Sequence, residues 1–262
     1  MKWSLKQIKY VKKIKRNKVL ILITQVLISL FFLLIWEILS KHKIINPFIF
    51  SSPSRIIKTI INLFKTNNLI NHILVTSYEV IIAFLITTFF SLIIAIVLYR
   101  SEFISKVFDP YLTMLNSLPK VALGPIIIIW VGANIKSIIL MSVFISLIVS
   151  IQTIYNGFIN TDKNKIKLLN TFGATKKDIL FKVVIPSNYS VILNTLKINI
   201  SMCLIGVIMG EFLTSKAGIG YLILYGSQVF NLDLVMSGIV ILVILSIVLY
   251  KFTKYIEKHL IN

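Results

Sequence analysis

Long apolar segments without a charged residue dominate this chain. They cover residues 19–36, 80–99, 137–161 and 234–250. About 20 apolar residues cross the hydrocarbon core of a bilayer as a helix. The pattern therefore predicts an all-α, polytopic membrane protein with four clearly marked spans.

Two further apolar stretches, residues 111–131 and 189–212, are interrupted by polar or helix-breaking residues. The interruptions are Pro119, Lys120, Gly124 and Pro125 in the first stretch, and Asn194, Lys197 and Asn199 in the second. Such segments persist at membrane depth only where protein or a water-filled path surrounds them. The prolines fit a simple kink as well as a solute contact, and the two lysines are expected to reach the cytosolic surface. With these two stretches, six spans are expected.

Composition supports a membrane protein and argues against the most obvious alternative. Of the 262 residues, 57% are hydrophobic and 14% are charged, whereas about a quarter are charged in ordinary soluble chains. The net charge of +19 could suggest nucleic-acid binding. Because the lysines flank the spans, acidic lipid headgroups are the nearer partner, and no nucleic acid is expected.

The distribution of Lys and Arg predicts the orientation. Nineteen lie before residue 19, in 100–110, in 158–190 or after 250, whereas seven lie in the alternate loops. By the positive-inside rule, both termini and the 158–190 loop are cytosolic. The expected organisation is a basic cytosolic arm (1–18), a transmembrane domain (19–258) and a cytosolic tail (259–262). No small-residue cleavage site follows the first apolar run, so it is expected to remain as a span.

One charged insert, residues 161–186, contains signals for a pair of short helices. Gly173 can adopt the left-handed conformation that ends a helix, and Thr175 with Asp178 forms a capping box that begins another. Pro186 is expected to stop the second helix. Two short helices between spans can serve as a handle for another protein.

This spacing resembles the cytosolic loop of permease subunits in binding-protein-dependent ABC importers. That loop reads Glu-Ala-Ala, three residues, Gly, nine residues, then Ile-x-Leu-Pro. Gly173 and Pro186 match it, Val183 and Ile185 are apolar as required, and Lys167-Leu168-Leu169 depart from Glu-Ala-Ala. Four further stretches resemble the nitrate, sulfonate and taurine branch of the family, namely residues 118–125, 130–132, 210–213 and 218–220. The likeness therefore covers roughly residues 20 to 258.

The resemblance implies a type I importer permease whose pore is completed by a second permease copy, most simply a homodimer. It implies an extracytoplasmic substrate-binding protein outside and ATP-binding subunits inside. This chain has no phosphate-binding loop and no convincing catalytic constellation. ATP is therefore expected on separate subunits, with no catalytic, cofactor or metal residue here. The implied solutes are nitrate, sulfonates, taurine or vitamin precursors.

The segment expected to contact the ATPase comprises Lys167, Leu168, Leu169, Gly173, Ala174, Asp178 and Pro186. Apolar Ile166, Leu169 and Phe172 fall on one side of a helix, so a docking face is expected there. The alternative is that the helix pair rests on its own bundle, with this face covered by the chain itself.

Three glutamates border apolar runs, where an ionisable group suggests function. Glu37 and Glu79 are expected at the outer surface against headgroups. Glu211 follows Gly206 and Gly210, whose spacing permits close helix packing. We expect Asn199, Gly206, Gly210 and Glu211 near the translocation path or its gate. Alternatively, Glu211 only holds the loop of Gly218 and Gly220.

An ion-coupled secondary transporter is the main alternative function. It would require intramembrane carboxylates along a cation path and no docking loop. Cys203 lies alone in an apolar run and is expected to be a buried packing residue.

Overall fold

A computed structural model describes residues 5–66 and 69–261 of the chain. Within these residues, five helices are long and apolar enough to cross a membrane. They are α1 (Leu5–Lys41), α4 (Leu69–Arg100), α7 (Ile135–Ile159), α11 (Tyr189–Thr214) and α13 (Leu232–Ile261). Three of the charge-free runs lie within one of these helices, and the fourth, 137–161, extends two residues beyond the end of α7.

The interrupted stretch before residue 132 is a broken segment. Helix α5 (Glu102–Ser117) and the segment formed by η1 (Lys120–Leu123) and α6 (Gly124–Val131) meet at an angle of 90°. A residue that precedes proline is disfavoured in helical conformation, and Leu118, before Pro119, has extended φ/ψ of −67° and 141°. Counted as one span, this bent pair makes six.

The second stretch expected to be interrupted is instead one continuous helix. Helix α11 runs for 26 residues without a break. Its polar side chains find partners inside the protein, so they do not disturb the backbone. Lys197 forms an ion pair of 2.8 Å with Glu257 on α13. Its expected reach to the cytosolic surface stays a prediction.

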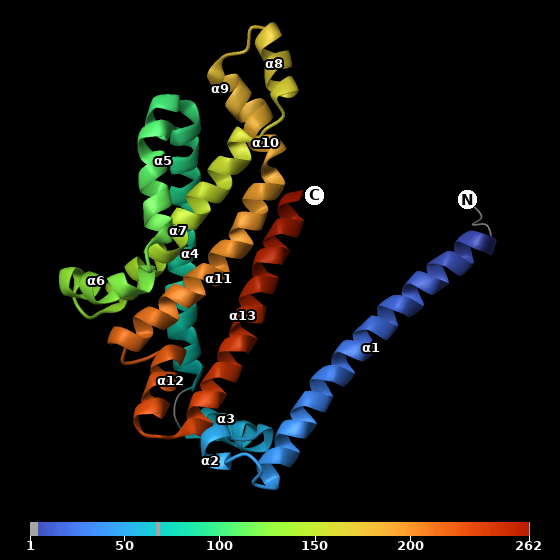
Figure 1. The fold of residues 1–262 in the computed structure, drawn as a ribbon, viewed down its shortest axis with the longest axis vertical. Helices are drawn as coiled ribbons and strands as arrows, with labels where there is room; N and C mark the ends of the chain where they lie inside the picture. Colours follow the sequence, from blue (N-terminus) through green and yellow to red (C-terminus); the bar gives the residue numbers. More distant parts are fainter. Residues whose placement is uncertain (1–4, 67–68, 262) are drawn as a thin grey trace.

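The bundle is built around α7, which packs against α4 and α11 (Figure 1). The main core cluster joins α4, α7, α11 and α13 through side chains such as Val80, Ile138, Val207 and Leu245. Helix α12 (Ile219–Gln228) folds back between α11 and α13. Cys203 is fully buried at this centre, as predicted.

Helix α1 stands apart from the bundle (Figure 1). Its most apolar stretch is 0% buried by the rest of the protein. It connects through α2 (Pro47–Phe50) to α3 (Pro53–Thr66), which is an amphipathic helix. Arg55 on α3 donates to Asp233 on α13 from Nε at 3.0 Å and Nη2 at 2.6 Å. This pair fastens the α2–α3 region to the bundle.

Candidate functional site

The charged insert forms two short helical segments at the end of the bundle opposite α3 (Figure 1). Helix α8 (Lys163–Thr171) begins at Asp162, whose Oδ1 accepts from the Asn164 N–H at 2.9 Å. It ends at Gly173, which has the predicted left-handed conformation with φ of 74°. No atom lies within 4 Å of a Cβ placed at Gly173. The turn therefore depends on backbone conformation and not on lack of space.

The predicted capping box at Thr175 is present. Helix α9 (Lys176–Ile179) begins with the Asp178 N–H donating to Thr175 Oγ1 at 3.2 Å, while the Thr175 N–H donates to Asp178 Oδ2 at 3.2 Å. Lys182, 2.7 Å away, together with Thr175 lowers the pKa of Asp178 to about 2. Because the pKa of Asp178 is lowered in the folded state, the contacts of its carboxylate stabilise the fold fully above the usual pKa of an aspartate. This stabilisation is lost only as pH falls through about 2. The start of α9 is thus insensitive to pH near neutrality.

Pro186 does not stop the second helix, contrary to the sequence prediction. The helical backbone continues from α9 through a π-turn (η2, Leu180–Val184) into α10 (Ile185–Ser187). The Ile185 N–H bonds back five residues to the Leu180 carbonyl, and Pro186 occupies the first turn of α10. Because the π-turn resets the bonding pattern, the missing N–H of proline is tolerated there. The chain breaks only at Asn188, immediately before α11.

The apolar side of α8 is divided between the protein interior and the surface. Ile166 and Leu169 pack against a second core cluster that includes Phe158 and Leu180. Phe172 is 80% exposed and Leu168 is 55% exposed. Of the predicted docking face of Ile166, Leu169 and Phe172, only Phe172 is therefore free to meet a partner, and the docking itself stays a prediction. Two of its members rest on their own bundle, and the free apolar surface consists of Leu168 and Phe172, here called the coupling patch.

Helix α11 crosses α7 at the small-residue positions. A Cβ at Gly206 would overlap the Ser142 backbone, and one at Gly210 would lie 3.0 Å from Ile138 Cα. The expected close helix approach is therefore present. Asn199 lies on the same helix in the protomer interior, where it bonds with Ser150 and its Nδ2 donates to Thr88 at 3.3 Å.

Glu211 sits in a fitted polar cradle formed by α4 and the start of α12. Thr76 Oγ–H donates to its Oε1 at 2.6 Å, and the Gly220 N–H donates to its Oε2 at 2.5 Å. A side chain at Gly218 would overlap the carboxyl group, and a Cβ at Gly220 would lie 2.7 Å from Oε2. The two glycines are therefore needed so that the backbone can close around this carboxylate.

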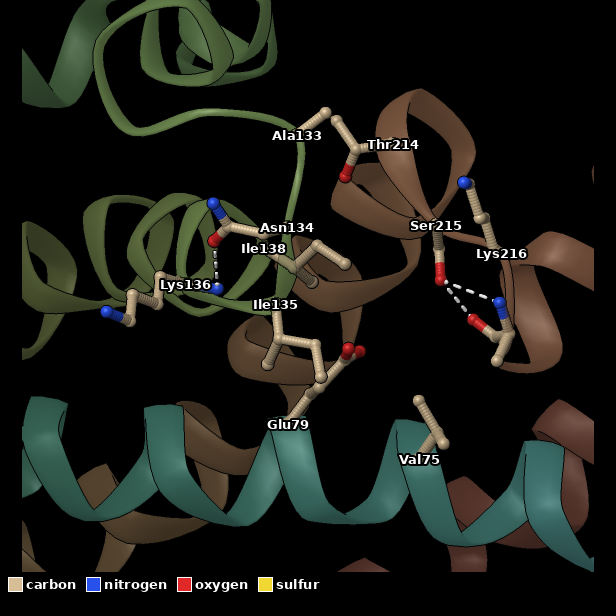
Figure 2. Close-up of a pocket in the computed structure, with 11 residues that line it drawn as sticks. Val75, Glu79, Ala133, Asn134, Ile135, Lys136, Ile138, Thr214, Ser215 and Lys216 are labelled. Atoms are coloured by element: carbon tan, nitrogen blue, oxygen red, sulfur yellow. Dashed lines mark hydrogen bonds between the residues drawn. The ribbon is translucent and has the colours of Figure 1, made fainter.

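Glu79 is fully buried, so the predicted contact with lipid headgroups is wrong. Helix α4 turns this residue toward α11 and the bundle interior because its neighbours Val80 and Ala83 are core residues. Beside it lies a cavity of about 510 Å³, whose lining also includes Asn134, Lys136, Ser215 and Lys216 (Figure 2). Glu37, the other glutamate predicted at headgroups, is partly exposed and accepts from the Ser54 N–H at 3.0 Å and from its hydroxyl at 2.7 Å at the start of α3. Its headgroup contact stays a prediction.

Sequence reasoning missed Thr76 and Glu79 as partners of Glu211. The residues lie about 135 positions apart in the chain, and no local pattern links them. A usable signal existed, because Thr76 and Glu79 are three positions apart and so share a helix face. A polar pair on one face of an apolar helix points inward more often than toward lipid.

Comparison with known proteins agrees with this architecture. Residues 87–262 match the family described as "Binding-protein-dependent transport system inner membrane component". A probable ABC transporter permease protein of Haemophilus influenzae is 31% identical over 83% of this chain and 88% of its own length. The formylaminopyrimidine transport permease protein ThiX of Halalkalibacterium halodurans is 27% identical over 89% and 94%. A putative aliphatic sulfonates transport permease protein SsuC of Bacillus subtilis is 24% identical over 87% and 83%.

A solved structure shares the fold. The chain resembles one from an inward-facing structure of the MetNI methionine ABC transporter, with a TM-score of 0.65 and 17% identity. The likeness covers 73% of this chain and 95% of that one. The family match covers more than half of the chain and includes the insert, the small-residue crossing, and Glu211 with Gly218 and Gly220. This protein therefore belongs to the family of inner membrane permease components of binding-protein-dependent transport systems.

Proposed function

We propose that this permease forms half of an ATP-driven import pore, paired with a second copy of itself and powered by separate ATP-binding subunits. A substrate-binding protein delivers the solute from outside, and the loop of α8 and α9 receives the ATPase inside. Family membership supports the transport role. The coupling patch is the observation that supports the partner, since it places two large apolar side chains on an otherwise charged loop.

The proposed orientation puts the termini and the coupling patch in the cytosol. The excess of Lys and Arg on that side supports it. The domain division follows, with residues 1–18 as a basic cytosolic arm, the bundle as the transmembrane domain and 259–262 as a cytosolic tail.

The proposed solute is a small polar organic molecule of the sulfonate, taurine or pyrimidine-precursor kind. The support is the similarity to permeases named for formylaminopyrimidine, aliphatic sulfonates and taurine. The first of these is the most similar of the three, at 27% identity. A secondary transporter would not need the coupling patch.

The helix crossing of α7 and α11 is proposed as the pivot beside the translocation path. Gly206 and Gly210 allow the two backbones to touch, and Asn199 bonds with Ser150 on α7 nearer the coupling loop. At the opposite end of α11, Glu211 is bonded to α4 and α12. Tight crossings with specific polar partners favour movement of the helices as units rather than independent bending.

The coupling patch can be tested by placing a charge on it. We expect Phe172→Glu and Leu168→Glu to reduce copurification of the cognate ATPase by about tenfold or more, because a charge would have to be buried at the contact. Insertion into the membrane should be unchanged. Lys163→Glu is the matched control, since it alters charge on the opposite side of the same helix. Normal ATPase binding and uptake in both patch variants would refute the docking role.

A further inference from the structure

The contact between Glu79 and Glu211 has a hydrogen-bonding deficit. Among the described residues, no donor reaches either oxygen of Glu79, and both oxygens are inaccessible to solvent. Thr76, one turn before Glu79 on the same face of α4, donates to Glu211 Oε1 at 2.6 Å, so the two carboxyl groups are neighbours. Both groups are acceptors when ionised, so a hydrogen bond between them requires one additional hydrogen.

Among the described residues around Glu79 and Glu211, no cation forms an ion pair that would compensate two ionised carboxylates. Lys136 and Lys216 line the neighbouring cavity, but neither has an ion pair with a described residue. His72 on α4 accepts from the Gly218 N–H through Nδ1 at 3.0 Å, so that nitrogen carries no proton and the ring is neutral. Tyr221 on α12 stacks on His72 and adds no positive charge.

Two ionised carboxylates in contact cannot both persist in a dry interior, whereas one proton between them removes the repulsion and supplies the missing donor. Glu211 already receives hydrogen bonds from Thr76 and Gly220, and such bonds favour the carboxylate form. Glu79 receives none, which assigns it the acid form.

We propose that Glu79 and Glu211 form a proton-binding site, in which the Glu79 carboxylic acid donates to the Glu211 carboxylate. When the proton leaves, it passes to water in the adjacent cavity, and two carboxylates remain face to face. The proton thus holds α4 to α11 and to the Gly218–Gly220 turn. Because its oxygens are occluded, the Glu79 carboxyl leaves no room for a solute or a hydrated cation, whereas a proton adds almost no volume.

Infrared spectroscopy of the full-length protein in lipid nanodiscs tests the assignment. At neutral pH we expect the C=O stretch of one protonated carboxylic acid. Glu79→Gln should abolish this band, because the amide supplies the N–H donor and no proton is needed. Glu211→Gln should abolish it for the same reason. Glu37→Gln is the control and should leave the band unchanged, since that carboxylate is satisfied by Ser54.

Thermal unfolding across pH gives an independent measurement. The wild type should lose stability as pH rises above about 4.3, the ordinary pKa of a glutamate in the unfolded chain, because from there on the folded state alone retains the proton. An amide cannot titrate in this range, so Glu79→Gln should flatten this dependence. A wild type without the acid band, a band that survives in both Gln variants, or stabilisation by added metal or alkali cations with no acid band would overturn the proposal. These measurements use neither ATPase nor solute, so their result is separate from that of the coupling-patch test.

Discussion

Gly206 and Gly173 are required for different physical reasons. Gly206 lies at a helix crossing where any side chain would overlap the Ser142 backbone. Gly173 has open space around it but holds a φ of 74°, which side chains disfavour. The first residue is therefore sensitive to volume, and the second is sensitive to conformation.

Replacing Gly206 by Val should separate α7 from α11 and destabilise the protein by about 1–3 kcal/mol, the usual cost of overpacking. Thermal unfolding of the purified protein measures this loss. Ile205→Val, on the adjacent and 48% exposed position, is the control and should change stability little. Equal stability of both variants would show that the crossing can relax without cost.

Replacing Gly173 by Val should cost about 1–2 kcal/mol in the left-handed conformation and move α8 relative to α9. We expect normal insertion and weakened ATPase binding, measured by copurification. Gly173→Asn is the matched control, because asparagine tolerates this conformation better than other residues with side chains. If Val and Asn behave alike, the left-handed turn is not what positions the coupling patch.

Elements at the two ends of the bundle are attached by local polar contacts rather than by a large core. Near α3, one carboxylate oxygen of Asp233 accepts hydrogen bonds from Arg55, and the other accepts from Ser51 Oγ–H at 2.6 Å. Near α8, the Asp162 cap and the Thr175–Asp178 box set the boundaries of the short helices. Such contacts fix orientation more than they add stability.

Replacing Asp233 by Asn should loosen the attachment of α2 and α3 while the bundle remains folded. The amide keeps one acceptor, so the loss is about 1 kcal/mol for a partly exposed pair. Limited proteolysis between residues 41 and 66 should become faster at unchanged global melting temperature. Glu102→Gln removes an exposed ion pair with Lys106 and serves as the neutral control. A cleavage rate equal to that of the wild type would contradict the proposed role of the Arg55–Asp233 pair in holding α2 and α3 to the bundle.

At the scale of the whole molecule, α3 and the coupling loop lie at opposite ends of the bundle (Figure 1). The distribution of Lys and Arg predicts which of these two ends faces the cytosol. Lys58 on α3 and Lys176 on α9 are both exposed, so they are suitable positions for surface probes.

Single cysteines at Lys58 and Lys176, in a Cys203→Ala background, should react with a membrane-impermeant thiol reagent from opposite sides. Lys176→Cys should become reactive only when the cytosolic face is opened, because the positive-inside rule places it there. The Cys203→Ala protein without added cysteines is the control for background labelling. Labelling of both positions from intact cells would invalidate the six-span arrangement.

Much of the helical fold was predictable from local patterns. The length of the charge-free apolar runs identified the long helices, because a segment can cross a bilayer only when its backbone polar groups are hydrogen-bonded within the segment. Pro119 indicated the break after α5, and the Gly173 turn and Thr175 box were readable from residue types within a few positions. These features depend on neighbouring residues along the chain, so the sequence alone could determine them.

Contacts between distant segments were decided only by the tertiary structure. Lys197 pairs with Glu257 on another helix. Ile166 and Leu169 pack against the core of their own chain, and a π-turn accommodates Pro186. Glu79 was expected at headgroups but is buried against Glu211 from another helix. The sequence determines which helices form because their hydrogen bonds are local, whereas the rotation and pairing of helices depend on shape and charge across the bundle, which only packing can select.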